Sequence, residues 1–410
     1  MKKIALSLAS VLVATAFAPE ASAIPAFARQ QGKACSTCHF QHYPALNDYG
    51  RSFKASGFTE MGKQGTIKGE NLSLPEVLNS SMFFKFRYQD SNGSDVTGTP
   101  TTASGQWQIP DEFALLMGGR VSNNIGFMFE GQLKDAVAVL AGFKMPFMFP
   151  VGEGEMKVGA VPFSTDSLGA SYGFELLNTG AVRNVRISEH RAETSAQQYI
   201  AGATGLGGAQ GVAFVVADPL FFVNLTRYAP DSATDQKMSL NYLRAAYTPT
   251  VGEWDVGVGF QYWSGTQSDS TGVKGSDYKG RAIDAQAQGA VGGMPLGVYF
   301  TTMTAPASGA TVNAFNGSTN ASKKATTILA ELGVMPGVVT VQAGYRKADT
   351  GAATNSKDDS VTLGATYHLT QNVQLQLVHS TRSKNGAVGR YDGSQEKGTA
   401  LTTFMLSAGL

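Results

Sequence analysis

Residues 254–262 read WDVGVGFQY, in which apolar residues alternate with polar residues or glycine. The same period of two recurs at residues 124–133, 339–346 and 361–368. Successive side chains of an extended strand point to opposite faces, so each segment predicts a strand with one apolar face and one polar face. Such strands build either a soluble sandwich with its apolar faces inward or a membrane barrel with its apolar faces outward.

The connections between the predicted strands separate these two architectures. In the C-terminal half, short turns such as Val291–Met294 and Met335–Gly337 alternate with long polar loops such as Ser264–Lys279 and Ala305–Lys324. Short turns at one end and long loops at the other are typical of outer-membrane barrels. We therefore predict an all-β fold, a transmembrane antiparallel β-barrel over residues 81–410.

The predicted strand number is sixteen, with eighteen as the alternative. Counting back from Leu401–Leu410 gives eleven strands as far as Gly211, and five more fit before Pro162. The stretch Phe163–Gln210 lacks a clear alternation, so it is either one long insertion folded into the lumen or a further pair of strands. A barrel of this size encloses an aqueous channel.

The composition excludes several classes of protein. The chain has 410 residues, 48 of them glycine, and 32 Lys+Arg against 31 Asp+Glu give a formal charge of +1. This balance argues against a nucleic-acid partner, which requires a basic excess. A mean hydropathy of -0.09 does not suit a helical membrane bundle, which needs several apolar runs of about 20 residues.

The N-terminus predicts export. Lys2 and Lys3 precede the apolar run Ile4–Phe17, and Ala21-Ser22-Ala23 is a small-residue cleavage pattern. These are the three parts of a secretory signal peptide, here residues 1–23. Together with the predicted barrel, this places the mature chain in a bacterial outer membrane, in contact with its lipid.

The two cysteines form the motif Cys35-x-x-Cys38-His39, the attachment signature of haem c. Two thiols three positions apart can add to the two vinyl groups of one haem, and the adjacent imidazole can reach the iron. Three other interpretations remain open. A zinc site needs four ligands, a thiol–disulfide motif is expected in a thioredoxin-like βαβ context, and a disulfide between the two cysteines gives His39 no role.

Residues 24–80 are predicted to form a small monohaem cytochrome c domain that precedes the barrel. A covalent haem supplies apolar surface that such a short segment lacks. The domain either plugs the barrel at its periplasmic mouth or hangs in the periplasm. Basic residues near the motif are candidate partners of the haem propionates, or else solvated surface charges: Arg29, Lys33, Arg51 and Lys54.

The second axial ligand of the haem iron has three candidates. Met61 follows the motif at a distance that lets the chain pass around the haem edge, and a Met/His pair would raise the reduction potential. His368 faces the predicted lumen near the periplasmic mouth. His42 is the third candidate, with poor geometry because it lies only three residues after His39.

Four short runs around the haem motif carry a resemblance to a known family: residues 25–30 (PAFARQ), 35–39 (CSTCH), 44–47 (PALN) and 50–54 (GRSFK). They resemble the N-terminal signature of the fused monohaem cytochrome–porins, which include the outer-membrane iron oxidases of iron-oxidising bacteria. The match ends near residue 60, and the barrel agrees with the family only in type and length.

The resemblance implies a function in electron transfer. Electrons would enter at the cell surface from an extracellular donor, with ferrous iron as the expected one. The haem would capture them and pass them to a periplasmic carrier such as a soluble cytochrome c. The alternative function is a diffusion porin for small solutes, in which the haem-bearing domain acts as a gate or sensor.

Overall fold

The computed structural model describes most of the chain after the expected signal peptide, which lies outside the described residues. The described ranges are 25–70, 72–92, 105–134, 140–181, 187–205, 207–230, 237–268, 274–309, 311–316, 320–386 and 398–410. None of the helices in these ranges is long and apolar enough to cross a membrane.

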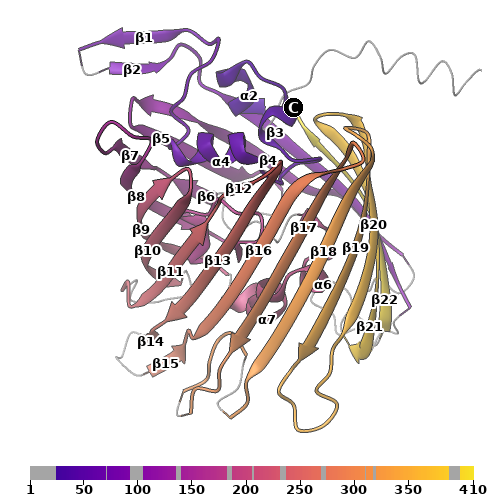
Figure 1. Ribbon diagram of the computed structural model, residues 1–410. Coiled ribbons are helices and arrows are strands. Elements are labelled where there is room, and N and C mark those ends of the chain that lie inside the picture. The colour runs from indigo at the N-terminus through magenta and orange to yellow at the C-terminus, as the bar shows by residue number, and fades with distance from the viewer. Residues whose placement is uncertain are drawn as a thin grey trace, which may run out of the picture.

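The strands form a closed antiparallel barrel, which confirms the predicted fold class (Figure 1). β22 pairs with β3 and closes the ring. The described residues supply sixteen strands, because β6 with β7 and β11 with β12 are each one interrupted strand. The barrel strands are β3 (Ser80–Ser91), β4 (Gln106–Ser122), β5 (Ile125–Gln132), β6 (Leu140–Lys144), β7 (Phe147–Pro150), β8 (Lys157–Thr165), β9 (Ala209–Asp218), β10 (Phe221–Pro230), β11 (Leu240–Tyr247), β12 (Thr250–Val251), β13 (Trp254–Ser264), β16 (Gly280–Val291), β17 (Met294–Ala305), β18 (Lys323–Met335), β19 (Val339–Asp349), β20 (Ser360–Thr370), β21 (Val373–Gly386) and β22 (Gly398–Gly409).

The apolar faces of the strands point outward. On β13, Val258 is 50% exposed and Tyr262 is 45% exposed, whereas Gln261 between them is fully buried. On the neighbouring β16, Ile283 points outward and Asp284 is buried in the interior. A soluble sandwich would bury the opposite face, so the alternation in the sequence encodes a barrel with an apolar exterior.

The two ends of the barrel differ in the length of their connections, as the sequence predicted. One end, here called the short-turn end, carries tight turns such as the one between β16 and β17, where Gly292 and Gly293 have φ values of 58° and 80°. Such left-handed backbone favours glycine. The other, the long-loop end, carries the extended connections, one of which contains the hairpin of β14 (Thr266–Ser268) and β15 (Lys274–Asp277) (Figure 1).

The segment between β8 and β9 is a single insertion that occupies the lumen, which confirms the first of the two predicted alternatives (Figure 1). It contains η2 (Ala170–Tyr172), α6 (Arg191–Thr194) and α7 (Ala196–Gly205). Its described side chains are mostly buried against the barrel wall. Leu177 and Gln197, for example, have no exposed surface. We call the described residues of this stretch, 170–181 and 187–205, the lumen insertion.

Three buried arginines of the barrel wall hold the lumen insertion through its glutamates. Arg244 on β11 lies 2.8 Å from Glu175, and Arg87 on β3 lies 2.6 Å from Glu189. Arg346 on β19 lies 3.8 Å from Glu193 and donates a hydrogen bond of 2.7 Å to the Ala192 carbonyl. All three guanidinium side chains are fully buried. The insertion is therefore anchored on three sides of the lumen.

The N-terminal segment lies at the short-turn end (Figure 1). It consists of α2 (Pro25–Gln31), α3 (Cys35–Cys38), α4 (Asp48–Ala55) and the hairpin of β1 (Thr66–Gly69) and β2 (Leu72–Pro75). Arg51 pairs with Asp255 on β13 at 2.5 Å, and Tyr43 donates a hydrogen bond of 2.8 Å to Ser407 on β22. Because β13 and β22 are far apart around the ring, the segment reaches across this end of the lumen.

Candidate functional site

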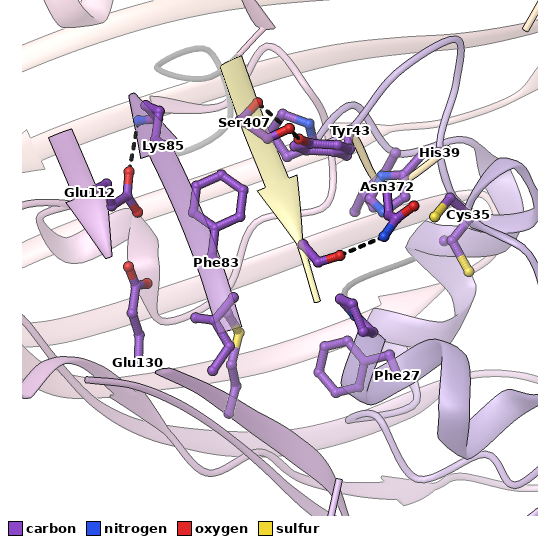
Figure 2. A pocket seen from close by; sticks show the side chains of 18 of the residues that line it. Phe27, Cys35, His39, Tyr43, Phe83, Lys85, Glu112, Glu130, Asn372 and Ser407 are labelled. Carbon is purple, nitrogen blue, oxygen red and sulfur yellow. Dashed lines mark hydrogen bonds and ion pairs between the residues drawn. The ribbon is translucent and has the colours of Figure 1, made fainter. Parts of the chain in front are cut away.

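A cavity lies between the N-terminal segment, the lumen insertion and the inner wall formed by β21, β22, β3, β4, β5 and β6. Its volume is about 200 Å³, counted as the space open to the centres of water-sized spheres, and part of it is open to solvent. Cys35, Cys38 and His39 line one side of it. Figure 2 shows Cys35 and His39 on one side of the cavity and Lys85, Glu112 and Glu130 on the opposite side.

Both thiols come from one short helical turn. α3 consists of Cys35–Cys38, so the two side chains lie one turn apart, and both are nearly buried. Asn47 fixes the turn from the next segment, because its amide donates a hydrogen bond of 3.0 Å to the Thr37 carbonyl. α4 packs closely behind it at Gly50, where an added Cβ atom would come within 2.2 Å of the Cys38 carbonyl oxygen.

The cysteines are free thiols in this structure, without a disulfide. Burial raises the pKa of Cys35 to about 12 and the pKa of Cys38 to about 11. Thiol–disulfide exchange requires a thiolate, which these values disfavour at neutral pH. Within the described residues, no group of three or more His, Cys, Asp or Glu side chains is placed to hold a metal ion.

His39 is held in a defined orientation. Its Nδ1 atom lies 3.1 Å from the Ala45 carbonyl oxygen, and its backbone forms a β-bridge with Leu46. A carbonyl oxygen only accepts hydrogen bonds, so Nδ1 carries the proton and Nε2 of the neutral ring carries the lone pair. Histidines that bind metals are commonly oriented by such a second-nitrogen hydrogen bond.

The cavity has an aromatic and aliphatic lining. The Phe27 ring stacks on Phe58 with centroids 4.8 Å apart and meets Phe53 edge-on at 5.3 Å. The barrel wall contributes further apolar side chains, among them Leu116 and Met405. An apolar lining with a few charged groups is the usual character of a cofactor site.

The charged lining consists of four basic side chains and three carboxylates, those of Glu112, Glu130 and Glu189, and the basic groups are paired with carboxylates or carbonyl oxygens. Lys85 lies 2.7 Å from Glu112, and Lys144 donates a hydrogen bond of 2.6 Å to the Tyr172 carbonyl. Lys54 donates one of 2.5 Å to the Glu175 carbonyl. Arg191 completes the set of four basic side chains that line the cavity. These cations are candidate partners for a negatively charged ligand.

The candidate propionate partners of the sequence analysis occupy different places. Lys54 lines the cavity. Arg29 donates a hydrogen bond of 2.6 Å to the Ser80 carbonyl, Arg51 pairs with Asp255, and Lys33 binds the Tyr49 hydroxyl at 2.5 Å. Arg29, Arg51 and Lys33 are not among the described residues that line the cavity.

The three candidate distal ligands lie outside the described lining of the cavity. Met61 is half-buried in the chain after α4. The ring of His42 is buried and its Nε2 lies 2.6 Å from Glu331 on β18. Burial alone would lower the pKa of His42, but the charge and hydrogen bond of Glu331 outweigh it and raise the pKa. His368 lies on β20, close enough to His42 for an electrostatic interaction.

Sequence reasoning missed the part of the site that the barrel wall supplies. Lys85, Glu112 and Lys144 line the cavity together with three methionines: Met82, Met128 and Met405. The strand alternation did carry a signal for Lys85, because polar Lys85, Arg87 and Gln89 alternate with Phe86 and Tyr88, and the structure buries the polar set. Which wall residues face the haem motif depends on how the N-terminal segment docks, and no local pattern encodes that.

No protein-family model matches the chain, and no curated protein matches it in sequence. Among solved structures it is similar to OmpT, an outer membrane protein of Vibrio cholerae, with 12% identity over 84% of this chain and 98% of that chain and a TM-score of 0.47. It is also similar to an anion-selective porin from Comamonas acidovorans, with 13% identity over 81% and 99% and a TM-score of 0.49. A third is the outer membrane protein OpdK from Pseudomonas aeruginosa, with 11% identity over 81% and 98% and a TM-score of 0.44. The similarity of the chain to these three proteins is one of backbone fold alone.

Proposed function

We propose that the chain is an outer-membrane electron-transfer protein with one covalent haem c at the short-turn end of its barrel. One observation carries the proposal: Cys35, Cys38 and His39 all line one mostly apolar cavity, which also contains four basic and three acidic side chains. The motif supplies the attachment chemistry, and the cavity beside it supplies apolar contacts and basic side chains suited to a flat apolar group with two carboxylates. The closed barrel with an apolar exterior supports insertion in an outer membrane.

Different residues of the chain would hold different parts of the cofactor. The Cys35 and Cys38 sulfurs would form the two thioether bonds, and His39 Nε2 would bind the iron. Lys54, Lys85, Lys144 and Arg191 are placed to neutralise carboxylates. The wall methionines Met82, Met128 and Met405 offer thioether ligands for the second axial position, for which the sequence had suggested Met61. When bound, haem c supplies a one-electron redox couple whose potential depends on its axial ligands.

The proposed direction of transfer follows from the resemblance to the fused cytochrome–porins. The donor is extracellular, with ferrous iron as the expected one, and the acceptor is a periplasmic carrier such as a soluble cytochrome c. The position of the motif agrees with this direction, since the short-turn end of an outer-membrane barrel faces the periplasm.

A diffusion porin is the second candidate function. The size of the barrel favours it, because sixteen strands enclose a channel wide enough for solutes. The lumen insertion bears on it, because its described residues such as Leu177 and Ala181 pack inside the barrel with no exposed surface, and three arginines anchor the segment. The haem c motif beside the cavity leads us to prefer electron transfer.

Mass spectrometry of the matured chain tests the haem assignment. We expect the full chain, produced together with a c-type cytochrome assembly system, to yield a peptide with Cys35 and Cys38 that is heavier by one haem. The double variant C35S/C38S should lack the added mass and still form the barrel, because both cysteines lie outside the barrel strands. An unmodified wild-type peptide with two free thiols would refute the proposal.

A further inference from the structure

We propose that the outer surface of the barrel binds a lipid whose headgroup carries more than one phosphate, at the long-loop ends of β16, β18 and β19. The binding surface consists of Arg281, Lys324 and Lys347, which we call the basic patch. All three side chains are exposed on the outward faces of their strands. This inference goes beyond the proposed function and does not depend on the haem, so either proposal can fail without the other.

Strand pairing brings the three basic residues together. Arg281 and Lys324 are both register partners of Thr304 on β17, the strand between them. Lys347 is the register partner of Thr326, which lies two residues from Lys324 on β18. Neighbouring strands are about 4.8 Å apart, so the backbones of Arg281 and Lys324 are about 10 Å apart. Side chains as long as those of arginine and lysine can converge on one headgroup from this spacing.

The basic patch lies where the apolar exterior of the barrel ends. Ile283, the next outward residue of β16 after Arg281, is 52% exposed. Tyr262 is the register partner of Arg281, Tyr345 lies two residues before Lys347, and both tyrosines are exposed. Aromatic girdles flank the apolar band of such barrels, and the long loops are extracellular. The basic patch is therefore at the level of the headgroups of the outer leaflet.

The hydrogen-bond donors of the basic patch are available to a ligand. In the described part of the chain, no side chain of the patch forms a hydrogen bond or an ion pair. Two carboxylates border the patch on the side of β19 and bind backbone amides. Asp349 accepts a hydrogen bond of 2.9 Å from the Gly351 amide, and Asp359 accepts one of 3.0 Å from the Ala348 amide. Three cations against two carboxylates leave the area positively charged.

Arg227 shows that the protein itself can bind an outward-facing cation at this end of the barrel. It lies on β10 and is also exposed. Its guanidinium donates hydrogen bonds to the Asn241 side chain, at 2.7 Å, and to the Met238 carbonyl. The basic patch differs from Arg227 because its cations are left to a partner outside the chain.

Phosphate is the chemistry that these donors fit. Guanidinium and ammonium groups form short, charge-assisted hydrogen bonds with phosphate oxygens. A phosphodiester carries one negative charge, so three cations match a headgroup with more than one phosphate. The outward orientation favours a lipid over a soluble anion, because the acyl chains of a lipid can pack on the apolar face that begins at Ile283.

Native mass spectrometry of the full chain in neutral detergent, titrated with diphosphoryl lipid A, tests the proposal. We expect the triple variant R281Q/K324Q/K347Q to bind this lipid about a hundredfold more weakly than the wild type. The matched control is R227Q, which removes an outward cation that already has protein partners. It should bind the lipid as the wild type does.

Single variants keep the test decisive if the triple variant does not fold. R281Q, K324Q and K347Q should each bind diphosphoryl lipid A about fivefold more weakly than the wild type. Unchanged affinity in the folded variants would overturn the proposal. An equal loss in R227Q would overturn it as well, because the effect would then come from surface charge in general.

Two further probes separate the lipid headgroup from other ligands. Phosphatidylcholine has no net charge and should bind the wild type and the triple variant equally weakly; binding to the wild type as tight as that of diphosphoryl lipid A would refute recognition of the headgroup. Inorganic pyrophosphate has the charge but no acyl chains, and at equal concentration it should not displace the lipid. Displacement would indicate a site for soluble anions and overturn the assignment to a lipid.

Discussion

Replacing Arg244 by methionine is expected to lower the free energy of unfolding of the barrel by about 3–5 kcal/mol. The Arg244 guanidinium is fully buried between Glu175, at 2.8 Å, and Asp284, at 2.7 Å, and both carboxylates are fully buried as well. The variant leaves the two buried carboxylates without the guanidinium that pairs with both of them. Denaturant titration in detergent micelles, followed by circular dichroism, measures the loss.

Two further variants show whether the uncompensated charge causes this loss. R227M removes an exposed arginine on the neighbouring strand β10 and should change the stability by no more than about 0.5 kcal/mol. The triple variant R244M/E175Q/D284N removes all three charges and should regain much of the lost stability. If R244M were as stable as R227M, the lumen insertion would not be anchored as described.

The second large effect is expected for His39→Ala. The variant should keep both thioether bonds, because they form at Cys35 and Cys38, but its haem spectrum should change from low spin to high spin. The reason is the loss of the proximal ligand, whose ring is oriented by the hydrogen bond from Nδ1 to the Ala45 carbonyl at 3.1 Å. Absorption spectroscopy of the purified variant measures the change, and added imidazole should reverse it.

His379→Ala is the matched control for this variant. His379 lies on the exposed side of β21 and hydrogen-bonds to Thr402, away from the cavity. Its replacement should leave the haem spectrum unchanged. An unaltered spectrum in the His39 variant would show that another residue binds the iron.

The sequence predicted those features that a local pattern encodes. Val258, Phe260 and Tyr262 face outward because a strand has a period of two, and the number of such strands followed from counting them. The haem motif is local as well, since Cys35, Cys38 and His39 are neighbours in the chain. The lengths of the connections predicted which end of the barrel carries the long loops.

The sequence could not predict contacts between segments that are distant in the chain. Arg51 lies close to the haem motif in sequence, which suggested a propionate partner, but docking brings it to Asp255, 204 residues further on. Lys144 is a second example, because it is distant from the haem motif in the chain and yet lines the cavity from β6. The lumen insertion was recognisable only as a region without alternation, because its burial depends on three arginines from three separate strands.

The most direct test of the central claim is the reduction of the haem by a ferrous complex that cannot cross the membrane, followed by absorbance in intact cells carrying the wild-type chain. We predict that the haem is reduced while the outer membrane is intact, because the barrel carries electrons across the membrane to the haem. A haem that stays oxidised until detergent dissolves the membrane, and is then reduced by the same complex, would contradict electron transfer across the barrel.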